Sequence, residues 1–254
     1  MFEPLVTAFR TLTILPLPGR DSDHPASALP MFPVVGIVIG IIQYTIARGC
    51  GMLFSDAPMI GGLLVTAAVI GGTGALHLDG FADVADGFGG GRTRERILEI
   101  FKDSRHGTYG VAAIVFSIAG RTILTSWCID FRRYELLVLA PVVSRTVQAW
   151  ACTLLPYGGR ATGEGASAFF TGGKHLFLTA VSVLCLAGFL IVFRPVWYGV
   201  AVLIVPLLPV TLFFIICKRT LGGLTGDCLG AANEMAELSA LFAGAALNGI
   251  VRLP

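Results

Sequence analysis

Long apolar runs separated by shorter polar segments dominate the chain. The first four runs cover about residues 32–54, 59–78, 107–129 and 134–156. A run of about 20 apolar residues is long enough for a helix to cross a bilayer. The region 176–217 is too long for one span, and Arg194–Pro195 divides it in two because proline and the residue before it disfavour a helix. With a last run at about 230–251, the pattern predicts seven transmembrane helices.

The composition supports this interpretation. The 254 residues are 55% hydrophobic and 13% charged, whereas a soluble domain carries about 25% charged residues. The net charge of +2 is too small to indicate a nucleic-acid partner, so none is expected. We therefore expect one all-α domain over residues 1–254, a polytopic helical bundle in the lipid bilayer, and the sequence leaves open whether it forms a homo-oligomer.

The first 30 residues do not resemble a span. Pro4, Pro16 and Pro18 interrupt the apolar residues, and Glu3 and Arg10 add charge. Residues 5–15 form either a short helix at the membrane surface or a loosely packed arm.

The distribution of Lys and Arg predicts the orientation. Most of these residues fall before the first span, between spans two and three, after span four and before the last span. The intervening loops carry fewer of them. By the positive-inside rule, the N-terminus and the three long polar loops lie in the cytoplasm, which implies a cell (inner) membrane location.

A group of aspartates follows the second apolar run, in "HLDGFADVADGFGGGR" (77–92). Asp79, Asp83 and Asp86 are spaced i, i+4 and i+7, which places them on one face of a helix. Like charges this close repel each other, and a divalent cation would turn the repulsion into binding. Oxygen-only ligands favour Mg²⁺, Mn²⁺ or Ca²⁺ over zinc.

A further carboxylate, Asp103, precedes the third span and can return to the same membrane edge. Lys102 and Arg105 flank it, and Arg92 ends the first acidic segment. Carboxylates for a metal and basic groups for phosphate are the parts that phosphoryl transfer needs. The alternative for a single aspartate is a solvated helix cap.

The segment "DVADG" (83–87) resembles the opening of the CDP-alcohol phosphotransferase signature. That signature continues with Ala-Arg and ends with two aspartates four residues apart. Here Gly90 and Gly91 stand where Ala-Arg is expected, and Gly107 replaces the last aspartate. These departures weigh against phospholipid synthesis, which is kept as an alternative function.

A second family is more similar over nearly the whole chain. "GALHLDGFADVADGFGGG" and "RILEIFKDSRHGTYG" resemble adenosylcobinamide-GDP ribazoletransferase, also called cobalamin-5′-phosphate synthase. "LPLPG", "FPVVGIVIG", "VSRT" and "GGLTGDCLGAANE" agree with it. The resemblance implies a Mg²⁺-dependent membrane enzyme that joins adenosylcobinamide-GDP to α-ribazole or its 5′-phosphate and releases GMP. His106 stands where that family more often has an aliphatic residue.

The resemblance gives roles to the polar residues. It implies that Asp79, Asp83, Asp86 and Asp103 hold the metal, and that catalysis falls to Asp83, Asp86 and Asp103. Asp103 is the first candidate to accept the proton of the attacking hydroxyl. The remaining candidates would bind the anionic or corrinoid substrate: Arg92, Lys102, Arg105, Arg160 and Asp227.

Three residues within the apolar runs also need partners. Arg121 and Arg145 fall inside spans three and four, where arginine is costly and is expected to reach an inward carboxylate or phosphate, or the interface. His77 would either bind a ligand or orient an aspartate. A transporter is the second alternative function, but its essential charges belong near the middle of the bilayer, and this acidic cluster is expected at the edge.

Overall fold

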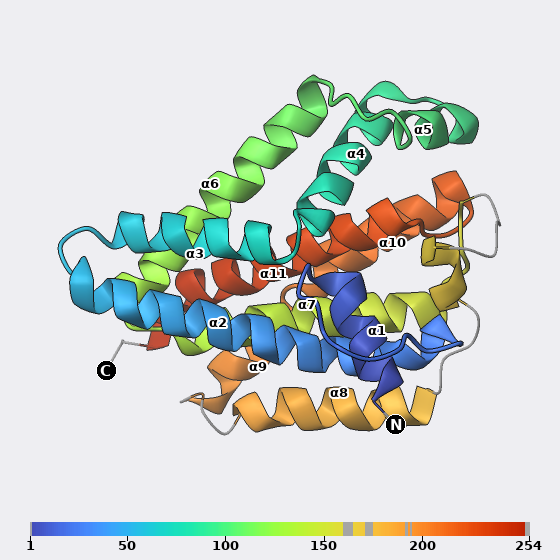
Figure 1. Ribbon diagram of the computed structural model, residues 1–254. Helices are drawn as coiled ribbons and strands as arrows, with labels where there is room; N and C mark the ends of the chain where they lie inside the picture. Colours follow the sequence, from blue (N-terminus) through green and yellow to red (C-terminus); the bar gives the residue numbers. More distant parts are fainter. Residues whose placement is uncertain (1, 160–164, 171–174, 191–192, 194, 252–254) are drawn as a thin grey trace.

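The protein is a bundle of helices in its computed structural model, which describes residues 2–159, 165–170, 175–190, 193 and 195–251 (Figure 1). The first half of the chain forms α1 (Glu3–Leu12), a 3-10 helix (Pro25–Met31), α2 (Phe32–Leu53), α3 (Pro58–Gly72), α4 (Leu76–Gly90), α5 (Arg94–Ile100) and α6 (Thr108–Asp130). The second half forms α7 (Glu135–Leu154), a 3-10 helix (Gly165–Phe170), α8 (His175–Leu190), α9 (Val196–Ile204), α10 (Leu207–Leu221) and α11 (Gly226–Val251). No strand occurs among these residues, apart from an isolated bridge between Tyr157 and Leu224.

The predicted all-α membrane bundle is confirmed, but the number of seven spans is not. Four stretches are long and apolar enough to cross a membrane: Pro25–Leu53, Thr108–Asp130, Glu135–Leu154 and Val196–Leu221. The bent pair α3 and α4 would make a fifth. Helix α8 is apolar but short, and α11 is interrupted by acidic residues, so neither meets the same criterion in the part of the chain described.

The second predicted span, 59–78, does not run straight. Helix α3 ends at Gly72, and α4 begins at Leu76 with an angle of 89° between them. Gly74 and Ala75 have positive φ angles of 61° and 59°. This left-handed backbone interrupts the right-handed helix and lets the chain turn between α3 and α4. The aspartates at 79, 83 and 86 therefore lie on a helix of their own, which Figure 1 shows rising from the bundle beside the first half of α6.

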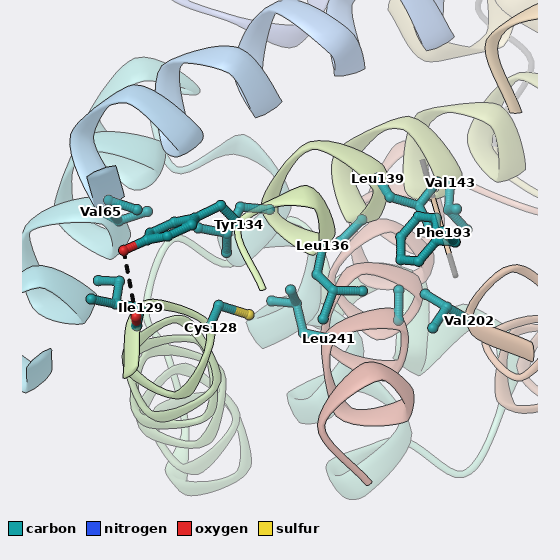
Figure 2. Packing of buried hydrophobic residues seen from close by; sticks show 14 of the residues in the cluster. Val65, Cys128, Ile129, Tyr134, Leu136, Leu139, Val143, Phe193, Val202 and Leu241 are labelled. Atoms are coloured by element: carbon teal, nitrogen blue, oxygen red, sulfur yellow. Dashed lines mark hydrogen bonds between the residues drawn. The ribbon is translucent and has the colours of Figure 1, made fainter. Parts of the chain in front are cut away.

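The apolar core lies where α2, α7 and α11 pack together. Leu136, Leu139 and Val143 of α7 share one cluster with Leu241 of α11, and Figure 2 shows Phe193 beside Leu139 and Val143. Gly36 and Gly40 let α2 approach α7 closely, because a Cβ on either would lie 2.6 Å from the α7 backbone.

A second core seats the N-terminal segment. Residues 5–15 were expected to form a surface helix or a loose arm, and the structure has α1 with Ala8, Phe9 and Leu12 buried. These side chains pack with Leu29 of the first 3-10 helix and with Phe32 at the start of α2. The segment is thus part of the packed bundle.

Four buried charged residues connect α6, α7 and α11. Arg121 pairs with Glu234 at 3.0 Å and with Glu237 at 2.5 Å, and Arg145 pairs with Glu237 at 2.5 Å. Gln43 of α2 also donates to Glu237. Of the alternatives left open by the sequence, both arginines thus take the inward carboxylate. Two positive and two negative side chains compensate one another, which makes their burial tolerable.

Candidate functional site: an acidic cluster beside a cavity

Helix α4 places the three aspartates in different surroundings. The side chains of Asp79 and Asp83 are 65% and 13% exposed, whereas Asp86 is buried. All three lie on one face of the helix, as predicted. That face is exposed to solvent at Asp79 and packs against the start of α6 at Asp86. The three aspartates therefore have different surroundings, and we give them different roles.

Asp86 caps the start of α6. Its carboxylate accepts hydrogen bonds from the backbone N–H groups of Gly107 at 2.6 Å and Gly110 at 2.8 Å. A carboxylate at a helix N-terminus is stabilised by the free N–H groups and by the helix dipole. Both positions require glycine, because an added Cβ would lie 2.6 Å from the carboxylate at 107 and closer still at 110. This cap explains the two glycines of "HGTYG" and shows that Asp86 fixes the position of the loop.

His106 is the residue that this loop brings to the acidic cluster. Its ring nitrogens lie 3.7 Å from Asp79 Oδ1 and 3.8 Å from Asp83 Oδ1. The imidazole is therefore placed between two carboxylates, where their negative charge favours a cation. No role was predicted for His106, and the signal that could have found it was its position three residues after Asp103.

Asp227, which is distant in sequence, lies near Asp79 and Asp83. We call these three carboxylates the acidic cluster. Helices α4 and α11 pack closely at Gly80, where an added Cβ would lie 2.9 Å from the carbonyl oxygen of Asp227. Burial raises the pKa of Asp227, and the nearby charge of Asp79 raises it further, while a hydrogen bond from Thr225 opposes the shift. The site thus gathers the carboxylates of Asp79, Asp83 and Asp227, and His106 lies beside the first two.

Asp103 has a different partner. It forms a two-pronged pair with Arg105, at 3.0 Å to Nε and 2.9 Å to the terminal nitrogen, and both side chains are exposed. The hydrogen bonds and charge of Arg105 lower the pKa of Asp103 to about 2. None of the contacts recorded for Asp103 in the described chain reaches Asp79, Asp83 or Asp86.

The predicted basic residues lie in the segments before and after α5. Arg92 and Lys102 are exposed, and Arg105 is paired with Asp103. Arg94 donates to the backbone carbonyls of Leu221 and Gly158, which ties α5 to the end of α10 and to the loop after α7. Arg160 lies outside the described residues.

A cavity of about 820 Å³ opens beside the aspartates. It is enclosed by α1, α4, α7 and the start of α11, with Asp79 and Asp227 in its wall. His77, predicted to bind a ligand or orient an aspartate, is buried and also lines this cavity. A volume of this size is typical of sites for small organic molecules.

Carboxylate oxygens are ligands that a hard cation prefers, but the described residues do not form a complete metal site. Among the residues that the structure describes, no three His, Cys, Asp or Glu side chains converge closely enough to hold a metal ion. Asp79 and Asp83 nevertheless present oxygen ligands on either side of His106, and their mutual repulsion favours an added cation. Oxygen ligands of this kind are those that hard cations such as Mg²⁺ prefer.

The fold and the site define the class: an α-helical membrane protein with an acidic cluster and a cavity between its helices. Comparison with known proteins identifies the family. The model for cobalamin-5-phosphate synthase matches residues 4–245.

Curated relatives agree along the full length. An adenosylcobinamide-GDP ribazoletransferase of Chlorobaculum tepidum is 38% identical over 262 residues, covering 98% of each chain. A protein of the same name from Syntrophobacter fumaroxidans is 36% identical, covering 97% of this chain and 100% of the relative. One from Shigella boydii is 34% identical over 91% and 95%. No solved structure matches the chain significantly.

The chain belongs to the cobalamin-5-phosphate synthase family. The resemblance found in the sequence motifs is therefore confirmed. Family membership also confirms the expected class of enzyme, a transferase of cobalamin biosynthesis.

Proposed function

We propose that the protein joins adenosylcobinamide-GDP to α-ribazole or its 5′-phosphate and releases GMP. The observation that carries the proposal is a family match over almost the whole chain, together with an acidic cluster beside a cavity for a small molecule. In the reaction, a ribose hydroxyl of the ribazole attacks the phosphorus on the cobinamide side. The bond from this phosphorus to the GMP oxygen breaks, the new phosphodiester forms, and the hydroxyl proton leaves to a base.

Asp79 and Asp83 are the residues that we propose to hold Mg²⁺ in this reaction. When bound there, the ion would neutralise charge on the pyrophosphate, where phosphoryl transfer most needs it. His106 now lies between the two carboxylates and would have to turn away. Asp86 has both oxygens engaged by backbone N–H groups, so we give it a positioning role.

The hydroxyl proton needs an acceptor near the cavity. Asp103 is exposed, and Arg105 holds its pKa at about 2, which makes it a weak proton acceptor. Asp227 lines the cavity, and burial raises its pKa. We therefore propose Asp227, in place of the expected Asp103, for this step.

The basic residues of the loop supply positive charge at the cytoplasmic edge. We propose that Arg92 and Lys102, which are exposed, contact the phosphates of the incoming nucleotide. The same edge location, in a cell (inner) membrane, would give the site access to cytosolic substrates.

The test uses the full chain purified in nanodiscs. Supplied with adenosylcobinamide-GDP, α-ribazole and Mg²⁺, it should release GMP and form a cobalamin product in equal amounts, and EDTA should stop both. A parallel reaction with a CDP-alcohol and a lipid acceptor tests the phospholipid alternative. Turnover in that reaction and none in the first would overturn the proposal.

A further inference from the structure

The cavity beside the aspartates has two chemically different walls. One wall is apolar and belongs to a single hydrophobic cluster that includes Phe32, Cys152, Phe169 and Leu229. The rings of Phe32 and Phe169 lie 5.9 Å apart. The other wall carries the carboxylates of Asp79 and Asp227. An occupant must therefore be apolar on one side and able to donate hydrogen bonds on the other.

Two buried polar atoms in the lining have no partner among the described residues. His77 is 2% exposed and its Nε2 makes no hydrogen bond, and Gln148 is 3% exposed and its Oε1 makes none. The amide nitrogen of Gln148 donates to the carbonyl of Leu229, and the amide oxygen has no partner. A buried polar atom without a partner is costly, so this pair indicates groups that a ligand satisfies.

The charge of the lining argues against a phosphate inside the cavity. Asp21, Asp79 and Asp227 line it. Arg10 is the basic side chain in the described lining, and it is already engaged by Asp21 at 2.8 Å and by the carbonyls of Leu17 and Gly19. Carboxylates accept hydrogen bonds from neutral hydroxyl groups and repel anions.

We infer that this cavity binds the acceptor of the reaction through its uncharged nucleoside part, the heterocyclic base and the ribose. The apolar wall matches a flat aromatic base, and the carboxylates of Asp79 and Asp227 match ribose hydroxyls. His77 and Gln148 supply the polar contacts between the two walls. This assignment rests on the proposed function for the identity of the acceptor, α-ribazole. It places the attacking hydroxyl at the acidic cluster, and it leaves the corrinoid and GDP outside the cavity.

Binding to the wild-type protein gives the first test. Calorimetry on the full chain in nanodiscs, without Mg²⁺ or corrinoid, should show binding of α-ribazole at one site. Free benzimidazole should compete for that site, because it offers the aromatic part alone, and GMP should not. Competition by GMP with none from benzimidazole would overturn the inference.

A matched pair of variants on α7 gives the second test. Gln148→Leu removes the free acceptor and should raise the Kd for α-ribazole about tenfold. The control, Thr146→Val, lies two residues earlier and lines a different cavity, and it should leave that Kd unchanged. Binding of adenosylcobinamide-GDP should be the same in both, which shows that the variants are folded.

The outcomes separate the inference from the proposed function. An unchanged Kd for Gln148→Leu, with GMP release by the wild type, would reject the cavity and keep the transferase activity. Binding of α-ribazole that responds to Gln148→Leu, with no GMP release by the wild type, would keep the cavity and reject the reaction. If Gln148→Leu fails to fold, the competition between benzimidazole and GMP decides.

Discussion

At the scale of single residues, the aspartates that look alike in the sequence have separate tasks in the structure. Asp83 is largely buried and faces His106, and Asp103 is exposed and paired with Arg105. The i, i+4, i+7 spacing correctly placed three of them on one helix, because it depends only on helical geometry. The spacing carries no information about the partner of each carboxylate, since partners come from other parts of the chain.

The first prediction compares two Asp→Asn variants. Asp83→Asn should reduce turnover by at least ~100-fold, since it removes a proposed Mg²⁺ ligand and charge from the reacting centre. Asp103→Asn should reduce it by less than about fivefold, because it breaks an exposed ion pair. GMP release at saturating Mg²⁺ measures both. Equal losses in the two variants would contradict the assignment.

The second prediction concerns the cap on α6. Asp86→Asn keeps the size of the side chain but removes its negative charge and one of the two acceptors that hold Gly107 and Gly110. We expect a loss of about 1–3 kcal/mol in the free energy of unfolding, measured by denaturant titration in detergent. Glu99→Gln on the exposed face of α5 is the control and should change it by less than about 1 kcal/mol. A stability change at Asp86 no larger than the control would argue against a capping role.

At the scale of helices, the site depends on how closely α4 and α11 approach each other. Gly80 faces the backbone of Asp227, with space for a hydrogen atom but not for a methyl group. A glycine within a helix permits close packing of helices. The sequence did not show which helices meet, because contact between residues 80 and 227 depends on the tertiary arrangement.

The third prediction follows from this contact. Gly80→Ala should push α4 away from α11 and shift Asp79 relative to Asp227, so turnover should fall at least ~10-fold while the protein stays folded. Gly249→Ala, also on α11, is the control, because an added Cβ there meets no atom within 4 Å. Thermal unfolding and GMP release should be measured on both variants. Full activity of Gly80→Ala would show that this packing is not needed to align the site.

The fourth prediction concerns the buried charges that join α6, α7 and α11. Glu237 accepts from Arg121, Arg145 and Gln43, and Glu237→Gln would leave one buried positive charge without compensation. Breaking a buried ion pair by removing one partner costs about 3–5 kcal/mol. We expect a loss of this size in the free energy of unfolding, measured in the same detergent as the control Glu99→Gln. A loss below about 1 kcal/mol would mean that the network contributes little to stability.

At the scale of the whole molecule, the sequence predicted the helical bundle and most of its helices. Apolar runs fix where helices form, since a bilayer leaves the backbone few other options. The runs could not show the 89° bend between α3 and α4, which depends on the positive φ angles of Gly74 and Ala75. They also could not join Asp227 to the aspartates of α4.

The fifth prediction tests the orientation of the whole chain. The positive-inside rule places the loop before α6 in the cytoplasm and the loop between α2 and α3 outside. Ser104 and Ser55 are exposed residues in these two loops, and they differ little in chemistry or accessibility. In intact cells, a membrane-impermeant thiol reagent should label Ser55→Cys and leave Ser104→Cys unlabelled. Five of the six native cysteines are buried and Cys185 is only partly exposed, so the wild-type chain measures the background.

Permeabilising the membrane should then make Ser104→Cys reactive at a rate similar to that of Ser55→Cys. This result would place His106 and the acidic cluster on the side where nucleotide substrates are made, because Ser104 lies two residues before His106. The reverse pattern, with Ser104→Cys labelled in intact cells, would put the cluster outside. The proposed reaction would then lack its nucleotide supply, so the topology experiment tests the functional proposal independently of any activity assay.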